Sequence, residues 1–188
     1  MSAADRQRWD EHYRHRSDYP DPDPLLLLYT PSADDQAHAL DLAGGMGQNA
    51  LWLAEQGYTV DLMDISRVAL VRAQRQMAAR GLRRVNMFQV DFDQVQLNPD
   101  TYDLVCVFRY WNRWLLPQIR AAVKPGGRII YETFNSGYLA LRPDFNPEYL
   151  LESGELLGSF GDWRVIHHDE LSTTSQVVAV KPDATAAG

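Results

Sequence analysis

The chain has 188 residues, a length typical of one globular domain whose core needs no disulfide or metal to hold it together. Its 25 acidic residues outnumber its 18 basic ones, and the formal charge of −7 argues against a general nucleic-acid binder, which usually carries a basic surface. Five arginines between Arg72 and Arg84 leave room for a local basic patch, although a solvated helix end explains them better.

The single cysteine, Cys106, excludes an intramolecular disulfide, which is typical of a reducing compartment. Cys106 lies in an apolar run and is expected to be a buried strand residue. Residues 1–16 are polar and lack the apolar core of a secretory signal, and no segment approaches the roughly 18 apolar residues of a membrane span. We therefore expect a cytoplasmic protein without a membrane partner.

Hydrophobic periodicity predicts a helix over about residues 5–15, followed by a stiff proline-rich connection at 18–24. Strands and helices then alternate. The expected elements are a strand at 39–42, a helix at 48–56, a strand at 58–63, a helix from the N-cap Ser66 to 80, strands at 84–90 and 102–108, a helix at 115–123 and a strand at 128–133. This alternation indicates an α/β fold with a parallel sheet and helices on both faces.

The C-terminal third departs from the alternation. We expect a loop at 135–147, a helix at 150–160, and strands at 163–168 and 176–180 that form a hairpin and add an antiparallel pair to the sheet edge. Residues 182–188 are expected to be a frayed tail. The whole chain, 1–188, is predicted to be one domain: an N-terminal helix and candidate lid at 1–30, a cofactor-binding core at 35–135, a substrate-side region at 136–181, and the tail.

The most informative segment is a glycine-rich turn, Asp41-Leu42-Ala43-Gly44-Gly45-Met46-Gly47, between the first strand and the next helix. Such a turn lets a ligand approach the backbone N–H groups at a helix N-terminus. The next two strands end at Asp64 and Asp91, where carboxylates can accept from ribose hydroxyls and an adenine can lie on Phe92. Because the carboxyl ends of parallel strands share one edge, these features together predict a nucleotide-like ligand.

The glycine motif and the charge of Asp41 help to choose between nucleotide-like ligands. The dinucleotide fingerprint G-x-G-x-x-G is absent, because Gln48, Asn49 and Ala50 follow Gly47. Asp41 would repel a pyrophosphate but attract an ammonium, directly or through water. S-adenosylmethionine carries an ammonium, a sulfonium and no phosphate, so the pattern favours it over a nicotinamide dinucleotide.

These residues resemble the class I S-adenosylmethionine-dependent methyltransferases. The first motif of that family, D-x-G-x-G-x-G, corresponds to Asp41–Gly47, with Ala43 in place of the first glycine. Further correspondences are Val60–Ser66, Gln89–Phe92, Tyr102–Phe108 and Val123-Lys124-Pro125-Gly126-Gly127, so the resemblance covers about residues 35–135. Within the family the chain looks most like the small bacterial tellurite-resistance and thiopurine-type methyltransferases, through Gln48–Gly57, Asp64-Ile65-Ser66, Tyr131-Glu132-Thr133-Phe134 and the N-terminal Trp9–Tyr13.

The resemblance implies a Rossmann-like fold with a mostly parallel seven-stranded sheet and an antiparallel C-terminal strand. It also implies that Asp64 holds the ribose and that Asp91 and the Phe92 N–H bind the adenine. Gly45 and Gly47 would lie against the methionine part. The full set of expected cofactor-binding residues is Asp41, Ala43, Gly44, Gly45, Gly47, Asn49, Asp64, Ile65, Asp91, Phe92, Phe108, Arg109 and Trp9, with S-adenosylhomocysteine as the product. No metal site is expected, because no Cys/His cluster has zinc spacing.

Residues for a small-molecule acceptor are expected after the fourth strand. Arg109 is expected to bind an anionic group, Tyr110 and Trp111 to wall a flat or apolar acceptor, and Glu132 to act as a base or, more simply, as a partner of Arg109. Tyr131 and Phe134 are expected to complete the pocket or to pack in the core. Trp9, His12 and Tyr13 share one side of the N-terminal helix, as a lid or as a packed face, and His12 is the histidine expected as a base.

Three other interpretations stay open at this point. One is that the chain is a non-catalytic module that binds the methyl donor. The sequence does not separate a module from an enzyme, because methyl transfer by in-line displacement needs little catalytic machinery beyond alignment. Alternatively it is a nicotinamide-dependent oxidoreductase, against which the missing fingerprint argues. A nucleic-acid methyltransferase would act through the arginine segment, although no Asn/Asp-Pro-Pro-Tyr motif follows the fourth strand.

Overall fold

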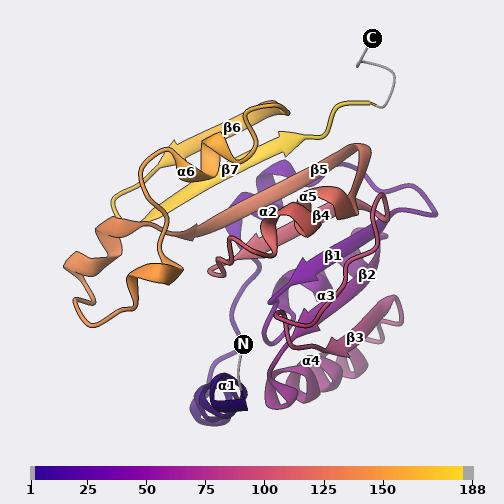
Figure 1. Cartoon of the computed structure of the whole chain (residues 1–188). Helices are drawn as coiled ribbons and strands as arrows, with labels where there is room; N and C mark the ends of the chain where they lie inside the picture. Colours follow the sequence, from indigo (N-terminus) through magenta and orange to yellow (C-terminus); the bar gives the residue numbers. More distant parts are fainter. Residues whose placement is uncertain (1–2, 184–188) are drawn as a thin grey trace. The chain divides into compact units, whose positions relative to one another are not determined.

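The computed structural model describes residues 3–183 (Figure 1). These residues form two compact units, of which the first ends at Leu97 and the second begins at Asn98. Most of the tail expected at 182–188 lies outside the described residues. A single domain over 1–188 stays a prediction.

The first unit contains three parallel strands in the order β3-β2-β1 (Figure 1). Its elements are α1 (Ala3–His15), α2 (Pro24–Tyr29), β1 (His38–Leu42), α3 (Gln48–Glu55), β2 (Thr59–Asp64), α4 (Arg67–Ala79) and β3 (Val85–Gln89). Helix α3 packs on β1 and β2, and α4 packs on β2 and β3. Because β1 and β2 are almost wholly buried, their sequences are nearly continuous apolar runs, interrupted by Asp41 in β1 and by Asp61 and Asp64 in β2.

The second unit contains strands in the order β4-β5-β7-β6. Its elements are β4 (Tyr102–Phe108), α5 (Leu116–Ala122), β5 (Val123–Phe134), the 3₁₀ helices η1 (Ser136–Ala140) and η2 (Pro147–Tyr149), α6 (Glu155–Gly158), β6 (Arg164–Glu170) and β7 (Thr174–Val180). β4 and β5 are parallel, whereas β7 is antiparallel to both β5 and β6. The predicted C-terminal hairpin on the sheet edge is therefore confirmed, and Cys106 is buried in β4 as expected.

Two expectations about individual elements are wrong because long-range pairing overrides local signals. The predicted helix at 150–160 is reduced to α6, because Leu151 donates to the Phe134 carbonyl at 3.0 Å and accepts from the Ser136 N–H at 3.0 Å, which keeps its first part extended. The Lys-Pro-Gly-Gly segment was expected to precede the fifth strand, but β5 already begins at Val123. The reason is that Gly126 and Gly127 exchange backbone hydrogen bonds with Lys181 at 2.9 Å.

Helix α2 is an element that the sequence analysis did not predict. Proline at its first position and Asp23 as its N-cap, which accepts from the Leu25 N–H at 3.0 Å, start the helix directly after the proline-rich connection. Of the leucines that follow Pro24, Leu25 and Leu26 are buried. Between residues 3 and 183, no helix is both long and apolar enough to cross a membrane.

Candidate functional site

The carboxyl ends of β1, β2 and β3 lie side by side at one edge of the first unit. The register pairs Leu42 with Met63 and Asp64 with Gln89, so the three strands end at the same level. The glycine turn leaves the end of β1, Asp64 ends β2, and Asp91 follows β3 by two residues. The structure therefore brings together the turn and the two acids that the sequence placed at one edge.

The glycine turn needs residues without large side chains. Gly45 and Gly47 have φ of 58° and 75°, in the left-handed region that favours glycine. A β-carbon on Gly45 would overlap the Tyr13 hydroxyl, and one on Gly44 would overlap the Asp41 carboxylate. Ala43 also has a positive φ, 56°, so the alanine that replaces the first glycine of the motif holds a conformation suited to glycine.

Asp64 is the central charged group of this edge. It is 5% exposed, and its carboxylate accepts hydrogen bonds from the backbone N–H groups of Gly45 and Ser66, both at 2.8 Å. Burial raises the pKa of Asp64 to about 6; the two N–H bonds oppose this rise, and the nearby carboxylate of Asp10 adds to it. Asp64 thus binds the glycine turn and titrates close to neutral pH.

Asp41 and Asn49 are buried and support the local backbone. The Asp41 carboxylate accepts from the Ala50 N–H at 3.0 Å, which stabilises the first turn of α3. The Asn49 side-chain oxygen accepts from the Asp23 N–H at 2.8 Å and ties α3 to the segment before α2. Contacts of both side chains with a cofactor stay a prediction.

The segment after β3 holds the expected adenine-side residues. Asp91 is half-buried and accepts from the Asp93 N–H at 3.1 Å, while Phe92 is 3% exposed. Ile65, which follows Asp64, is also buried, and its carbonyl accepts from the Gln89 side chain at 3.2 Å. The bond between Gln89 and Ile65 joins the ends of β2 and β3.

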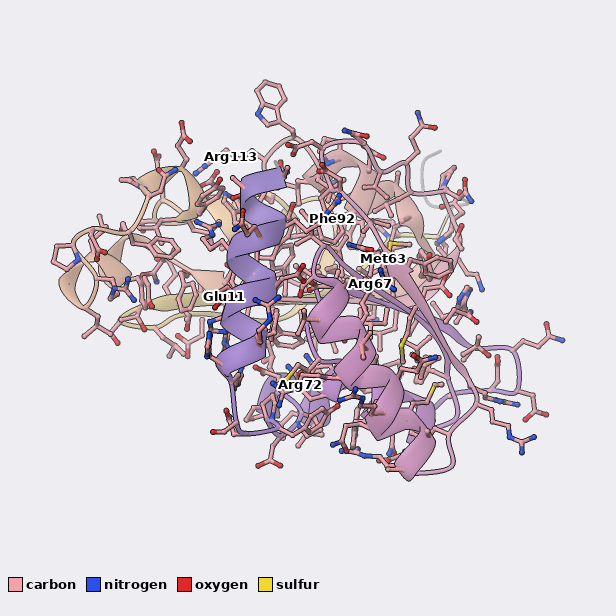
Figure 2. All side chains as sticks on the ribbon, turned by 90° about the horizontal axis from the view of Figure 1, so that it is seen from below. Glu11, Met63, Arg67, Arg72, Phe92 and Arg113 are labelled. Atoms are coloured by element: carbon pink, nitrogen blue, oxygen red, sulfur yellow. The ribbon has the colours of Figure 1, made fainter. Side chains whose placement is uncertain are left out.

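Helix α1 is held against α4 by polar contacts (Figure 2). The Asp10 carboxylate accepts from the Ser66 hydroxyl at 2.6 Å and from the Val68 N–H at 3.1 Å, at the start of α4. One turn further along α4, the Arg72 guanidinium donates to the Tyr13 carbonyl at 2.6 Å. Asp10 and Arg72 thus fix both the position and the direction of α1.

Trp9, His12 and Tyr13 form an aromatic cluster on α1. The Trp9 and Tyr13 rings stack with centroids 5.9 Å apart, and the His12 ring meets each edge-on at 5.4 and 5.1 Å. His12 is exposed, whereas Trp9 and Tyr13 are half-buried. Because the Tyr13 hydroxyl lies against Gly45, this cluster covers part of the glycine turn. Whether Trp9 and His12 contact a cofactor or substrate stays a prediction.

In the second unit, β4 ends in Phe108, and Arg109 and Tyr110 follow it. Phe108 is buried, and Arg109 has a φ of 58°, which is strained for a residue with a side chain. The Arg109 N–H donates to the Glu132 carbonyl at 2.8 Å, and its guanidinium lies 3.9 Å from the Glu132 carboxylate. Glu132 is therefore a partner of Arg109, the simpler of its two predicted roles.

Glu132 continues into a polar chain that crosses three strands. The Gln176 side-chain amide on β7 donates to the Glu132 carboxylate at 2.5 Å, and its carbonyl oxygen lies 3.0 Å from the His167 Nε2 on β6. We call Arg109, Glu132, Gln176 and His167 the polar chain. The sequence analysis identified neither Gln176 nor His167 as part of a site.

Several aromatic residues near β4 and β5 belong to the core. Tyr131 is fully buried, donates to the Tyr110 carbonyl at 2.9 Å and meets the Trp111 ring at 5.8 Å. Trp111 is 3% exposed, whereas Trp114 is 93% exposed. Phe134 stacks on Tyr138 with ring centroids 4.1 Å apart. Of the aromatics considered for an acceptor pocket, Trp111 and Tyr131 are buried, and Tyr110 is half-buried. Their contact with an acceptor stays a prediction.

An open pocket of about 530 Å³ lies in the second unit, around the segment between η1 and α6. Its walls combine apolar residues with three glutamates and Arg113, whose guanidinium is bound to Glu155 at 2.6 Å and to main-chain carbonyls. No group of three or more His, Cys, Asp or Glu side chains in the described part of the chain is placed to hold a metal ion.

Sequence comparison matches residues 39–127 to a family described as a methyltransferase domain. Hemagglutinin 1 of Eikenella corrodens is 30% identical over 139 residues, which cover 70% of this chain and 45% of that protein. The ubiquinone/menaquinone biosynthesis C-methyltransferase UbiE of Zymomonas mobilis is 26% identical over 149 residues, covering 74% and 61%. The chain therefore spans only about half the length of these curated relatives.

Comparison with solved structures identifies the fold class. TehB from Haemophilus influenzae superposes with a TM-score of 0.72 at 15% identity, covering 92% of this chain and 67% of that one. The predicted fold class is confirmed: a mixed, mostly parallel arrangement of seven strands with antiparallel C-terminal strands, as in the Rossmann-like methyltransferases.

Proposed function

Because the chain carries a class I S-adenosylmethionine-dependent methyltransferase domain, we propose that it transfers a methyl group from S-adenosylmethionine to a small-molecule acceptor. The observation that carries the proposal is the position of Asp64. This acid ends β2, is buried, and binds the glycine turn through the Gly45 N–H. A carboxylate at this place accepts from the hydroxyls of a bound ribose.

The charges around the turn fit S-adenosylmethionine better than a dinucleotide. Asp41 and Asp64 are 1% and 5% exposed, and Asp10 lies close enough to Asp64 to raise its pKa. A pyrophosphate would bring further negative charge beside these buried acids, whereas an ammonium and a sulfonium bring positive charge. The same carboxylates therefore disfavour the nicotinamide-dependent oxidoreductase alternative.

The bound donor supplies an activated methyl group, and the protein's task is to bind, align and exclude water. In this proposal Asp64 holds the ribose hydroxyls, Asp91 and the Phe92 N–H hold the adenine, and Gly45 and Gly47 leave room for the methionine part. Asp41 attracts the ammonium. Trp9 of α1 covers the donor, and His12 is a base for acceptors that arrive protonated.

A small acceptor is supported by one relative. UbiE is named as a C-methyltransferase of ubiquinone and menaquinone biosynthesis. The acidic net charge of −7 disfavours RNA or DNA as the acceptor. The cytoplasmic location stays a prediction.

Calorimetric titration with S-adenosylhomocysteine tests the proposal, with NADH as the control ligand. We expect micromolar binding of S-adenosylhomocysteine and none of NADH. Asp64→Ala should abolish that binding while the protein keeps its circular dichroism spectrum. Failure of the wild-type protein to bind S-adenosylhomocysteine, or normal binding by the variant, would refute the assignment of this edge.

A turnover assay distinguishes an enzyme from a non-catalytic module that only binds the donor. A catalyst incubated with S-adenosylmethionine and a panel of thiols, carboxylates, amines and phenols releases S-adenosylhomocysteine above the rate of the same mixture without protein. A module binds the donor but gives no acceptor-dependent release.

A further inference from the structure

We propose that strand β6 pairs antiparallel with β6 of a second copy of the chain, so that the protein forms a two-fold symmetric dimer through this edge. The inference is independent of the proposed function, because it concerns the assembly of the chain and not its donor or acceptor. It uses contacts of the second unit alone.

Strand β6 is an open edge of the second unit (Figure 1). It comes last in the order β4-β5-β7-β6 and pairs with β7 on one side. Six of the seven residues of Arg164–Glu170 are exposed, so neither face of the strand is covered along its length. An edge strand presents a row of backbone N–H and C=O groups that can pair with another strand. The outer side of β6 therefore offers a place for one.

Apolar side chains are gathered at the same edge. Val165 and Ile166 of β6 are 36% and 38% exposed, and Leu171, which follows the strand, is 43% exposed. Contiguous exposed apolar side chains are typical of surfaces that bind another protein. Their burial against a second chain would remove apolar surface from water and favour association.

Arg164 and Asp169 carry opposite charges and lie on the same face of the sheet. Arg164 is opposite Val180 of β7, and Asp169 is opposite Gln176. Val180 and Gln176 are four residues apart on β7, which runs without a register shift against β5, so both point to one face. Because directly opposite residues share a face, Arg164 and Asp169 point to that face as well.

A bulge in β6 produces this arrangement. The register against β7 shifts between Val165 and His167, so that Ile166 is accommodated as an extra residue. Without the bulge, Arg164 and Asp169 would face opposite sides, because side chains alternate along a regular strand. The two-fold axis of an antiparallel pair of identical strands runs perpendicular to the sheet, so residues that meet across it must share a face. The bulge thus lets Arg164 and Asp169 meet.

Neither of these two charged side chains has a partner in its own chain. Among residues 3–183, Arg164 and Asp169 form no hydrogen bond and no ion pair. The neighbouring Glu170 differs, because its carboxylate accepts from the Ser153 hydroxyl at 3.0 Å and from the Gly154 N–H. Arg164 and Asp169 are therefore available to charges of opposite sign on another chain.

One antiparallel register satisfies both charges twice. A two-fold pair centred on His167, the β6 member of the polar chain, places Arg164 of each copy opposite Asp169 of the other. A slip by one position would turn the side chains to the wrong face. A slip by two would set Arg164 opposite His167 or Leu171 instead. Opposite charges directly across a strand pair stabilise it, so the register centred on His167 is favoured.

The same features reject other strands. Charges and bulges on an edge strand discourage pairing with an arbitrary strand. β3, at the other end of the strand order, has no charged residue in Val85–Gln89, so it would leave Arg164 and Asp169 unpaired. A parallel copy of β6 would bring like charges together at both positions. An antiparallel second copy is therefore the occupant that the charges favour.

The test measures the mass of the full-length protein by sedimentation velocity across about a hundredfold range of concentration, because dimerisation depends on concentration. We expect the wild-type protein to approach twice the monomer mass at the upper end. Arg164→Asp and Asp169→Arg each set like charges opposite one another twice. Each variant should therefore dimerise at least about tenfold more weakly, with an unchanged circular dichroism spectrum.

A mixture of the two variants separates a charge pair from a structural role. One chain of Arg164→Asp and one of Asp169→Arg again set opposite charges against each other at both positions. We expect the equimolar mixture to dimerise under conditions where each variant alone stays a monomer. The double variant Arg164→Asp/Asp169→Arg should dimerise by itself. A side chain that only supports the fold of its own chain would give neither rescue.

Arg142→Asp is the matched control. It makes the same change of charge at an exposed arginine of the second unit and should leave dimerisation unchanged. Amide hydrogen exchange locates the interface without any substitution. Raising the concentration of the wild-type protein should slow exchange in β6 and leave exchange in the other edge strand, β3, unchanged.

Three results would overturn the inference. The first is a wild-type protein that stays monomeric at every concentration. The second is a dimer that both charge reversals leave intact, and the third is a dimer whose added protection lies outside β6. Binding of S-adenosylhomocysteine is measured separately, so failure of the proposed function leaves this test unaffected.

Discussion

The carboxylate of Asp64 accepts a hydrogen bond from the backbone N–H of Gly45 at 2.8 Å, so the acid that ends β2 holds the turn that follows β1. The same carboxylate accepts from Ser66, whose hydroxyl is bound to Asp10 of α1. Asp64 is thus the point where the strand edge, the glycine turn and the N-terminal helix meet. If Asp64 binds the ribose as proposed, its ionisation links that binding to pH.

The affinity for S-adenosylhomocysteine should fall with pH below about 6. Burial raises the pKa of Asp64 to about 6 in the free protein, and ribose hydroxyls bind the ionised carboxylate better than the neutral acid. We expect constant affinity above pH 7 and a loss approaching tenfold per pH unit below 6. Calorimetry from pH 5 to 8 measures this. Asp91→Asn should keep the pH dependence, whereas Asp64→Asn should bind weakly at every pH.

Asp64 should also make the free protein less stable at neutral than at acidic pH. A carboxyl group whose folded pKa is raised stabilises the fold below its unfolded pKa of 3.8, and this contribution disappears as the pH rises through about 6. For a shift of this size in a buried group the loss is about 3 kcal/mol.

The comparison with Asp64→Asn isolates that contribution, because asparagine does not titrate. Between pH 4 and pH 7.5, the unfolding free energy of the variant minus that of the wild type should rise by about 2.4 kcal/mol, because part of the wild-type contribution is already lost at pH 4. Urea denaturation at both pH values gives the four free energies. A difference that stays constant with pH would show that Asp64 has an ordinary pKa.

Ala43→Gly should stabilise the protein. Ala43 has a φ of 56°, and the left-handed conformation costs a residue with a β-carbon about 1–2 kcal/mol, part of which the greater freedom of glycine in the unfolded chain offsets. We expect a gain of up to about 1 kcal/mol, seen as a rise of a few degrees in Tm. As the control, Ala78→Gly on the exposed side of α4 should lose about 0.5–1 kcal/mol. A loss of stability in both variants would contradict the argument.

Asp10→Ala should release α1 from α4. It removes the acceptor of the Ser66 hydroxyl and the Val68 N–H, at an expected cost of about 1–2 kcal/mol in the docking of the helix. Amide hydrogen exchange should show faster exchange in α1 and unchanged protection in β1 and β2. The midpoint of the pH-dependent binding should also move to lower pH, because the Asp10 carboxylate helps to raise the pKa of Asp64.

Glu11→Ala provides the control for that variant. Glu11 is exposed and its side-chain contacts, with Arg14 and His15, lie within α1 itself. Its loss should change stability by less than about 0.5 kcal/mol and leave exchange in α4 unaffected. An equal release of α1 by both substitutions would mean that helix propensity, and not the Asp10 contact, holds the helix in place.

Local sequence patterns were enough to predict the alternation of strands and helices, the glycine turn, and the acids Asp64 and Asp91 at one strand edge. These features depend on short-range patterns: the periodicity of apolar residues, the N-cap Ser66, and glycines where the backbone turns sharply. Because parallel strands end together, local order alone was enough to place the two acids beside the turn.

The side chains that support these groups could not be predicted from sequence, because they come from distant parts of the chain. Asp10 reaches Ser66 across 56 residues of sequence, and Gln176 reaches Glu132 across 44. The extended segment at Leu151, where a helix was expected, depends likewise on pairing with Phe134 and Ser136. No local periodicity records such contacts, since their free energy comes from elements that meet only after the chain has folded.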